Sequence, residues 1–343
     1  MTSLLVRAPA GWLGPGRPVR DVQVLCRGAQ IDSLAPRAAL PADVEVVETR
    51  GFLMPAGADR HVHIELSDPA AVLMRGVTAV RDLAWPAHRI FPLADASETA
   101  SFNGPLIRAA GPMLTGLGGY PMRAGWAPAG TGREVEGPQD AAAAVAELAS
   151  SGATAVKVSL NAEAGPTPTD ADLMAICEAA READLPVTAH AQGAGQVERA
   201  LGAGVDELAH TPWTRLSDDV VEAAAQRMRI VSTLDILSHG RDTSELLVAL
   251  DNLRRFHETG GEVIYGTELG NGPIPAGIHT RELQLLARAG LTHDEVLGAL
   301  TRAPLDPGAP ADLIVLGSDP VADLAAFDNI RLVVRAGRVV MRR

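Results

Sequence analysis

Between residues 51 and 290 the chain alternates short apolar runs with longer amphipathic runs. The apolar runs are bounded by Gly, Pro or polar residues, and this pattern predicts buried strands. Eight strands are predicted, at Gly51–Ala58, Val77–Leu83, Leu106–Leu114, Ala153–Leu160, Pro186–His190, Glu207–His210, Ile230–Ile236 and Val263–Thr267.

The segments between most of these strands predict helices, because apolar residues recur at helical spacing after a helix-start signal. The predicted helices are 137–148, Asp170–Ala183, Ser217–Met228, Ser244–Glu258 and His279–Ala289. Eight strands alternating with helices predict an α/β protein with a (β/α)8 TIM barrel. A doubly wound sheet is the alternative, but no Gly-x-Gly-x-x-Gly fingerprint follows an early strand.

The two ends of the chain differ from the middle because they are rich in short strand-like runs. Val19–Leu25, Val44–Val47 and 312–316 are such runs, and 330–341 predicts a hairpin that turns at Ala336-Gly337. Neither end is long enough to fold alone. We therefore expect residues 1–50 and 305–343 to form one small β-sandwich domain beside a barrel of residues 51–304.

Composition narrows the classes of partner. A net charge of −12, with acidic residues spread along the chain, argues against nucleic acid and anionic membranes as partners and says little more. A small-molecule substrate is expected from the candidate site residues below. The N-terminus lacks a signal-peptide pattern, and no apolar run is long enough to span a bilayer. Cys26 and Cys177 lack metal-type spacing and predict reduced thiols in a cytoplasmic protein. The sequence is compatible with a homo-oligomer.

Only one of the 30 basic residues is a lysine, Lys157, and it lies in a predicted buried strand. The rest are arginines, so a generic cation is supplied by Arg throughout this chain. Lysine can lose its proton, act as a nucleophile or be carbamylated, whereas a guanidinium stays charged. A buried ammonium is also costly. Lys157 is therefore a candidate for chemistry that arginine cannot perform.

Further polar residues stand at or just after the ends of predicted strands. They are His61, His63, His190, His210 and Glu268. Barrel strands converge at their C-terminal rim, where barrel active sites lie. These side chains and Lys157 are therefore expected together at the C-terminal end of the barrel. A His-x-His pair on an extended segment places both rings on the same side, which suits two imidazoles on one metal ion.

The arrangement of these residues resembles the amidohydrolase superfamily of metal-dependent hydrolases, in the branch of imidazolonepropionase-like and prolidase-like enzymes. The segment 54–63 (Met-Pro-Ala-Gly-Ala-Asp-Arg-His-Val-His) resembles that family's Pro-Gly-x-x-Asp-x-His-x-His signature, with Ala56 at the usual Gly position. Segments 76–82, 152–158, 190–193, 205–210, 310–316 and 334–340 resemble further strands of the family. The resemblance covers nearly the whole chain.

The resemblance implies a binuclear metal site. His61 and His63 would hold the first divalent ion, His190 and His210 the second, and a carbamylated Lys157 would bridge both. Glu268 would contact the first metal and act as the general base. Histidine-rich ligation suits zinc, with manganese or cobalt as alternatives. A hydroxide between two such cations would attack a carbonyl carbon.

The sequence departs from the family pattern at two places near the site. Glu268 stands where the family has Asp, so the carboxylate reaches about one methylene further, and a misplacement near 1 Å can cost roughly a hundredfold in rate. Tyr120 lies in Gly-Gly-Tyr, where the family often has Gly-Gly-His. Tyr120 is a candidate for substrate binding or for loop packing. Further candidates for the substrate pocket are Trp213, Asp235, His239 and Arg241.

The resulting hypothesis is an enzyme that hydrolyses a C–N bond of an amide, cyclic amide or dipeptide-like substrate. One alternative is a mononuclear deaminase of the same superfamily, although such a site does not need Lys157. The other is a catalytically altered paralogue that binds a small molecule or performs a non-hydrolytic biosynthetic step, which Glu268 would support.

Overall fold

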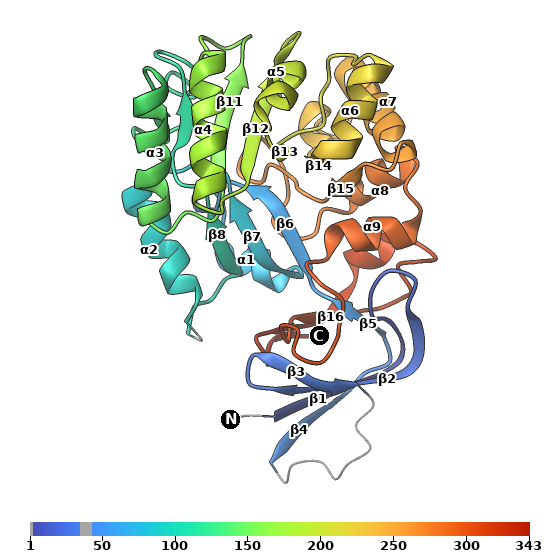
Figure 1. Ribbon diagram of the computed structural model, residues 1–343. Coiled ribbons are helices and arrows are strands. Elements are labelled where there is room, and N and C mark those ends of the chain that lie inside the picture. The colour runs from blue at the N-terminus through green and yellow to red at the C-terminus, as the bar shows by residue number, and fades with distance from the viewer. Residues whose placement is uncertain (1–2, 35–42, 100) are drawn as a thin grey trace.

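The computed structural model describes residues 3–34, 43–99 and 101–343 (Figure 1). Residues 1–2 and 35–42 of the predicted N-terminal segment 1–50 lie outside this description. Figure 1 shows strands from both ends of the chain gathered at one end of the molecule, next to a larger body of parallel strands and helices. The division into the two predicted domains stays a prediction.

One mixed sheet joins the two ends of the chain. Its order is β18-β17-β16-β5-β1-β2-β3, and β4 pairs with β1. The strands are β1 (Ser3–Trp12), β2 (Pro18–Arg27), β3 (Gln30–Leu34), β4 (Val44–Glu48), β5 (Phe52–Pro55), β16 (Leu313–Leu316), β17 (Ile330–Arg335) and β18 (Arg338–Arg342). Ala336 and Gly337 both have positive φ between β17 and β18, as a two-residue hairpin turn requires. Strands from both ends of the chain therefore share one sheet, in which β5 lies between β1 and β16.

The middle of the chain forms two parallel sheets. The first holds β6 (Gly57–Val62), β7 (Val77–Asp82) and β8 (Leu106–Ala109) in that order. The second has the order β10-β9-β11-β12-β13-β14-β15. Its strands are β9 (Met113–Thr115), β10 (Gly132–Glu134), β11 (Val156–Asn161), β12 (Val187–Gln192), β13 (Glu207–Leu208), β14 (Arg229–Val231) and β15 (Glu262–Ile264). From β11 to β15 the strands follow chain order without the reversal of a doubly wound sheet.

Hydrogen bonds link the three-stranded sheet to the seven-stranded sheet at two places, near β15 and near β11. On one side, the Arg60 N–H donates to Tyr265 O at 3.1 Å, and the His63 N–H donates to Leu269 O at 2.7 Å. On the other side, the Thr154 N–H donates to Ala109 O at 2.9 Å, between the start of β11 and the end of β8. The strands are too short there to pair as continuous ladders. The observed fold is therefore mixed α/β with parallel sheets joined at two places.

Helices alternate with the parallel strands. They are α1 (Pro69–Met74), α2 (Ala87–Ser97), α3 (Pro138–Ser150), α4 (Asp170–Glu182), α5 (Gln196–Ala203), α6 (Asp218–Arg227), α7 (Ser244–Glu258), α8 (Thr280–Arg288) and α9 (His293–Leu300), with 3-10 turns η1 (Ile64–Leu66), η2 (Asp235–Leu237) and η3 (Leu324–Asp328). The predicted helices are confirmed to within about two residues at each end. Thr169 and Thr292 form capping boxes that begin α4 and α9.

Three predicted strands are wrong in their extent. Ile230–Ile236 is a strand only as far as Val231, where β14 ends, and its last two residues belong to η2. The other two each divide into two strands. Gly51–Ala58 divides into β5, which pairs with β16 in the terminal sheet, and β6, which begins the parallel sheets. Leu106–Leu114 divides into β8 and β9 at Gly111, whose φ of +74° breaks the extended chain. A Cβ at Gly111 would also lie 2.7 Å from the Phe91 ring, so close packing there excludes a side chain.

The core is built mainly from Ala, Val, Leu and Ile, as the low aromatic content requires. Cys26 and Cys177 are buried and unpaired, and burial raises the pKa of each thiol to about 12. Among the described residues, every helix is too short or too polar to cross a bilayer. Lys157 is one of the largest fully buried side chains and the one basic residue among them.

Candidate metal centre

The predicted strand-end residues converge on one buried site. His61 lies on β6, Lys157 on β11 and His190 on β12. His63, His210 and Glu268 follow the ends of β6, β13 and β15. Each of the six side chains is buried, with an exposed fraction of 8% or less. Because parallel strands place their carboxyl ends at the same edge, residues separated by up to 207 positions share one site.

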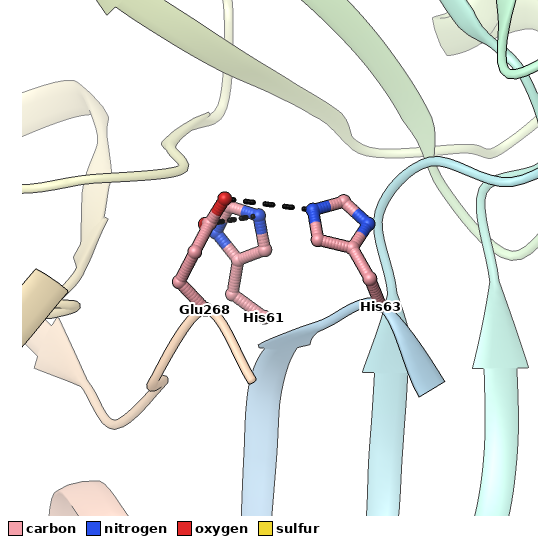
Figure 2. Close-up of side chains that lie close together, drawn as sticks. All are labelled: His61, His63 and Glu268. Carbon is pink, nitrogen blue, oxygen red and sulfur yellow. Dashed lines mark ion pairs between the residues drawn. The ribbon is translucent and has the colours of Figure 1, made fainter. Parts of the chain in front are cut away.

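His61, His63 and Glu268 form the tightest group (Figure 2). The His61 Nε2 lies 2.8 Å from Glu268 Oε2, and the His63 Nε2 lies 3.5 Å from Glu268 Oε1. One potential ligand atom from each residue lies within 4.8 Å of the other two. Two imidazoles and a carboxylate at this spacing are a ligand set typical of zinc and other divalent ions.

The chain around Glu268 aims its carboxylate at this group. Glu268 has a φ of +62°, which is unusual for a residue with a side chain. Its backbone N–H donates to His61 O at 2.8 Å, and the Asn271 Nδ2 donates to Glu268 Oε1 at 2.8 Å. The turn is further held by Asp59, which accepts hydrogen bonds from the backbone N–H groups of His61 and Thr267.

His190 and His210 form the second half of the site. The His190 Nδ1 and His210 Nε2 face each other at 3.0 Å. The other nitrogen of His210 lies 2.9 Å from the Thr233 hydroxyl, and the His190 Nε2 lies 3.1 Å from the Gln192 amide oxygen. His210 Nε2 is also 3.6 Å from Glu268 Oε2, so the two halves of the site are contiguous.

Three histidines are oriented through Nδ1. The Nδ1 atoms of His61 and His63 lie 2.8 Å from Ala209 O and 3.1 Å from Ala84 O. A carbonyl oxygen only accepts, so each Nδ1 carries a hydrogen, and Nε2 is the nitrogen that faces Glu268. Thr233 stands in the corresponding place beside His210. This second layer of hydrogen bonds is the arrangement that fixes metal-binding imidazoles.

Burial favours the metal-binding protonation states. It lowers the pKa of His61 and of His190 to about 4, whereas the pKa of His63 is raised, because burial there is outweighed by the hydrogen bond and the charge of Glu268. Burial opposes ionisation of Glu268, but its contacts with His61 and His210 outweigh this effect and hold its pKa well below the usual range. Neutral imidazoles beside an ionised carboxylate are the forms that bind a divalent cation.

Lys157 leaves a polar atom unsatisfied in this site. The Lys157 Nζ is buried and has no hydrogen-bond partner among the described residues. Burial lowers the pKa of Lys157 to about 7, against the opposing attraction of Glu268. Buried polar groups are rarely left unpaired without a functional reason. The donor set and this unpaired atom therefore fit bound metal ions.

Two of the predicted substrate-pocket residues adjoin the histidines. The Tyr120 ring centroid lies 5.3 Å from that of His190. The Trp213 centroid lies 6.3 Å from His190 and 6.1 Å from His210. Burial also raises the pKa of the Tyr120 hydroxyl well above its usual value. His239 and Arg241 are exposed in the loop after η2, and a Cβ at Gly272 in the loop after β15 would touch the His239 ring.

Asp235 is engaged in a separate network. Its carboxylate lies 2.7 Å from the His279 Nε2 and accepts hydrogen bonds from the Arg281 Nε at 2.8 Å and from the Gly240 N–H at 3.1 Å. Burial opposes ionisation, but the hydrogen bonds from His279, Ser238 and Arg281 hold the pKa of this carboxyl far below its usual range. These contacts join η2 to α8 and leave Asp235 few sites for a substrate.

The structure also brings in residues that the sequence reasoning missed. Trp126 stacks on His63 with ring centroids 4.5 Å apart, and Asn161 lies 3.3 Å from the His190 Nε2. Thr233 and His279 orient His210 and Asp235. Asn161 ends β11 four residues after Lys157, so strand-end position was an available signal for it. Trp126 lies in a loop without periodicity and gave no comparable signal.

A parallel α/β fold with buried histidines, a lysine and a carboxylate at its strand ends defines a metal-binding enzyme of the hydrolase type. The sequence pattern of the amidohydrolase family matches residues 52–340, and the chain belongs to that family. It is therefore a metal-dependent hydrolase of C–N bonds that acts on small molecules. A search of the curated proteins finds no match.

Solved structures with the same fold include prolidases and an ochratoxinase. A candidate prolidase from Bifidobacterium longum is 24% identical, with a TM-score of 0.86 over 99% of this chain and 95% of that chain. The A. niger ochratoxinase is 20% identical, with a TM-score of 0.83 over 100% and 96% of the two chains. A prolidase in complex with N-methylphosphonate-L-proline is 21% identical, with a TM-score of 0.80 over 100% of both chains.

Proposed function

We propose that the chain holds two divalent metal ions, most simply zinc, with manganese or cobalt as alternatives. His61, His63 and Glu268 would bind the first ion, and His190 and His210 the second. The facing nitrogens of His190 and His210, 3.0 Å apart, support a shared ligand between them. The strength of the proposal rests on the donor set, which is rich in histidine and buried.

Lys157 would bridge the two ions as a carbamate. In this modification the neutral Nζ bonds to the carbon of CO2 and a proton leaves, which converts a cation into an anion. The single observation that carries the proposal is the fully buried Lys157 Nζ without a hydrogen-bond partner among the described residues. An anion facing two cations removes the cost of that burial. It also gives a reason why no arginine occupies this position.

We propose that the parallel strands close into one (β/α)8 barrel of residues 51–304, and that segments 1–50 and 305–343 form a β-sandwich beside it. The hydrogen bonds that join β6 to the residues after β15, and β8 to β11, support closure. A closed barrel explains why side chains from β6 and from the end of β15 meet in Figure 2.

The reaction would be hydrolysis of a C–N bond. Bound divalent ions supply the acidity that makes a water nucleophilic at neutral pH and that polarises a carbonyl. The Glu268 carboxylate would take the proton from the attacking water and pass it to the leaving nitrogen. Tyr120 and Trp213 would hold the substrate beside His190, and His239 and Arg241 would contact its outer part.

The substrate class that we propose is an amide, cyclic amide or dipeptide-like molecule. The prolidases and the ochratoxinase among the structural neighbours support an amide bond. Two buried, unpaired cysteines support a reducing compartment such as the cytoplasm. Among the alternatives, the buried Lys157 argues against a mononuclear deaminase, and the contacts of Glu268 with three histidines argue against a site that has lost its metal.

The test is hydrolysis of a panel of Xaa-Pro dipeptides, N-acyl amino acids and cyclic amides by zinc-loaded protein. We expect turnover that is lost on chelation and in His61→Asn but kept in His257→Asn, a histidine on α7 whose nearest ionic partner is Glu295 at 3.6 Å. Turnover that survives chelation would contradict the proposed function. Release of ammonia from aminopurines or aminopyrimidines by a one-metal protein would favour the deaminase.

A further inference from the structure

The loop between β9 and β10 places two aromatic rings over the two halves of the site. The Trp126 ring lies against His63, with centroids 4.5 Å apart and planes inclined by 43°. The Tyr120 ring lies against His190, with centroids 5.3 Å apart and planes inclined by 35°. Both side chains are half-buried. One loop thus covers both proposed metal positions.

A hydrogen bond between these two rings fixes the direction of the Tyr120 hydroxyl. The Trp126 Nε1 lies 2.9 Å from the Tyr120 Oη. An indole N–H only donates, so the hydroxyl oxygen must be the acceptor in this bond. The proton of the hydroxyl then points away from Trp126. In the described part of the chain, no acceptor lies within hydrogen-bond distance of this hydroxyl.

A donor held in place, with no partner in the protein, is suited to a group that arrives with the substrate. In amide hydrolysis the carbonyl oxygen gains negative charge as the carbonyl carbon is attacked. Donors that are oriented before the reaction stabilise this charge without a further free-energy cost of reorientation. Removal of one such donor typically slows turnover about 100- to 1,000-fold.

We propose that Tyr120 donates its hydroxyl hydrogen bond to the carbonyl oxygen of the substrate as that oxygen gains negative charge, and that Trp126 is the positioning residue that aims this hydroxyl. The inference rests on the proposed hydrolytic function. It gives Trp126 a role exerted entirely through Tyr120. The proton stays on Tyr120 throughout, so this step is a hydrogen bond and not a proton transfer.

The first readout is the affinity of the zinc-loaded protein for methylphosphonate, a tetrahedral oxyanion that imitates the charged oxygen and needs no knowledge of the substrate. We expect Tyr120→Phe to weaken binding about 10- to 100-fold, the loss typical of a hydrogen bond to a charged group. Trp126→Phe keeps an aromatic ring but removes the N–H, and we expect a loss of about 3- to 10-fold. Equal metal content and melting temperature among the variants would show that the site is intact.

The double variant separates positioning from packing. If Trp126 acts only through the hydroxyl, Trp126→Phe has no further effect in the Tyr120→Phe background. Trp213→Phe is the matched control, because Trp213 also adjoins His190 but no hydrogen bond links it to Tyr120. Its effect should be the same in both backgrounds. The same pattern is expected in kcat for the best amide of the panel.

Three outcomes would overturn the inference. Equal affinity of wild type and Tyr120→Phe for methylphosphonate would show that the hydroxyl makes no contact with the oxyanion. Losses from Trp126→Phe that multiply with those of Tyr120→Phe would show that Trp126 acts by packing on His63. A two-metal wild-type protein that neither binds methylphosphonate nor hydrolyses any amide would overturn the proposed function and this inference together.

Discussion

The replacement Lys157→Met tests the buried amine directly, because methionine keeps the length of the side chain and removes its charge. In protein stripped of metal and CO2, the structure holds an amine with a pKa of about 7, against an unperturbed value of 10.5. A difference of 3.5 pKa units corresponds to about 5 kcal/mol, since each unit is about 1.4 kcal/mol. This is the order of destabilisation that the protonated lysine imposes on the metal-free fold.

The pH dependence of this destabilisation has a definite sign. Below pH 7 both folded and unfolded states bind the proton, so the full cost is present. Between pH 7 and 10.5 only the unfolded state binds it, and the free energy of unfolding therefore rises by about 1.4 kcal/mol for each pH unit. Lys157→Met lacks this contribution. The stability of wild type minus that of Lys157→Met should thus increase by about 3 kcal/mol from pH 7 to 9.

The assay is urea denaturation of the chelated proteins in CO2-free buffers at pH 6, 7, 8 and 9. Arg288→Met is the control, because Arg288 is paired with Asp242 on the surface and its replacement should give a difference that does not change with pH. With zinc and bicarbonate added, the order should reverse and wild type should be the more stable protein. A difference between wild type and Lys157→Met that does not change with pH in the chelated state would refute the reasoning.

Three other predictions concern the carboxylates and the metal. Glu268→Asp withdraws the carboxylate by about one methylene from His61, and we expect a loss of amide turnover of about 100-fold; a gain would show that Glu268 has impaired the site. Asp235→Asn should lower the free energy of unfolding by about 1–3 kcal/mol above pH 4, as measured by urea denaturation. This difference should shrink as pH falls through the acid range, because the folded-state pKa lies below the unfolded one; Asp242→Asn, which replaces an exposed carboxylate, should have a much smaller effect. Chelation should abolish turnover and added zinc should restore it, whereas recovery by buffer alone would contradict a metal requirement.

Much of the site was predictable because strand periodicity and strand-end position are local signals. His61, His190 and His210 were identified from their places at the ends of apolar runs, and Lys157 from its being the one lysine. The α/β alternation follows from the same runs. Strand boundaries were less predictable, since Gly51–Ala58 reads as one apolar run although Pro55 and Gly57 belong to different sheets.

The remaining features depend on contacts between distant residues. Asp235 was expected in the substrate pocket, and its contact with His279, 44 positions along the chain, leaves no local trace in the sequence. The Trp126 indole reaches His63 and Tyr120 from an irregular loop, where neither helical nor strand periodicity places a side chain. The contacts of such residues can be identified only in the folded structure, where the loops lie against the strand ends.

The most direct test of the account is the number of metal ions per chain, measured by elemental analysis of wild type and Lys157→Met after growth in metal-replete medium and purification without chelator. We predict about two divalent ions per wild-type chain and a clear loss in the variant. One ion or none in wild type, or an equal content in the two proteins, would contradict a binuclear centre built around a carbamylated Lys157.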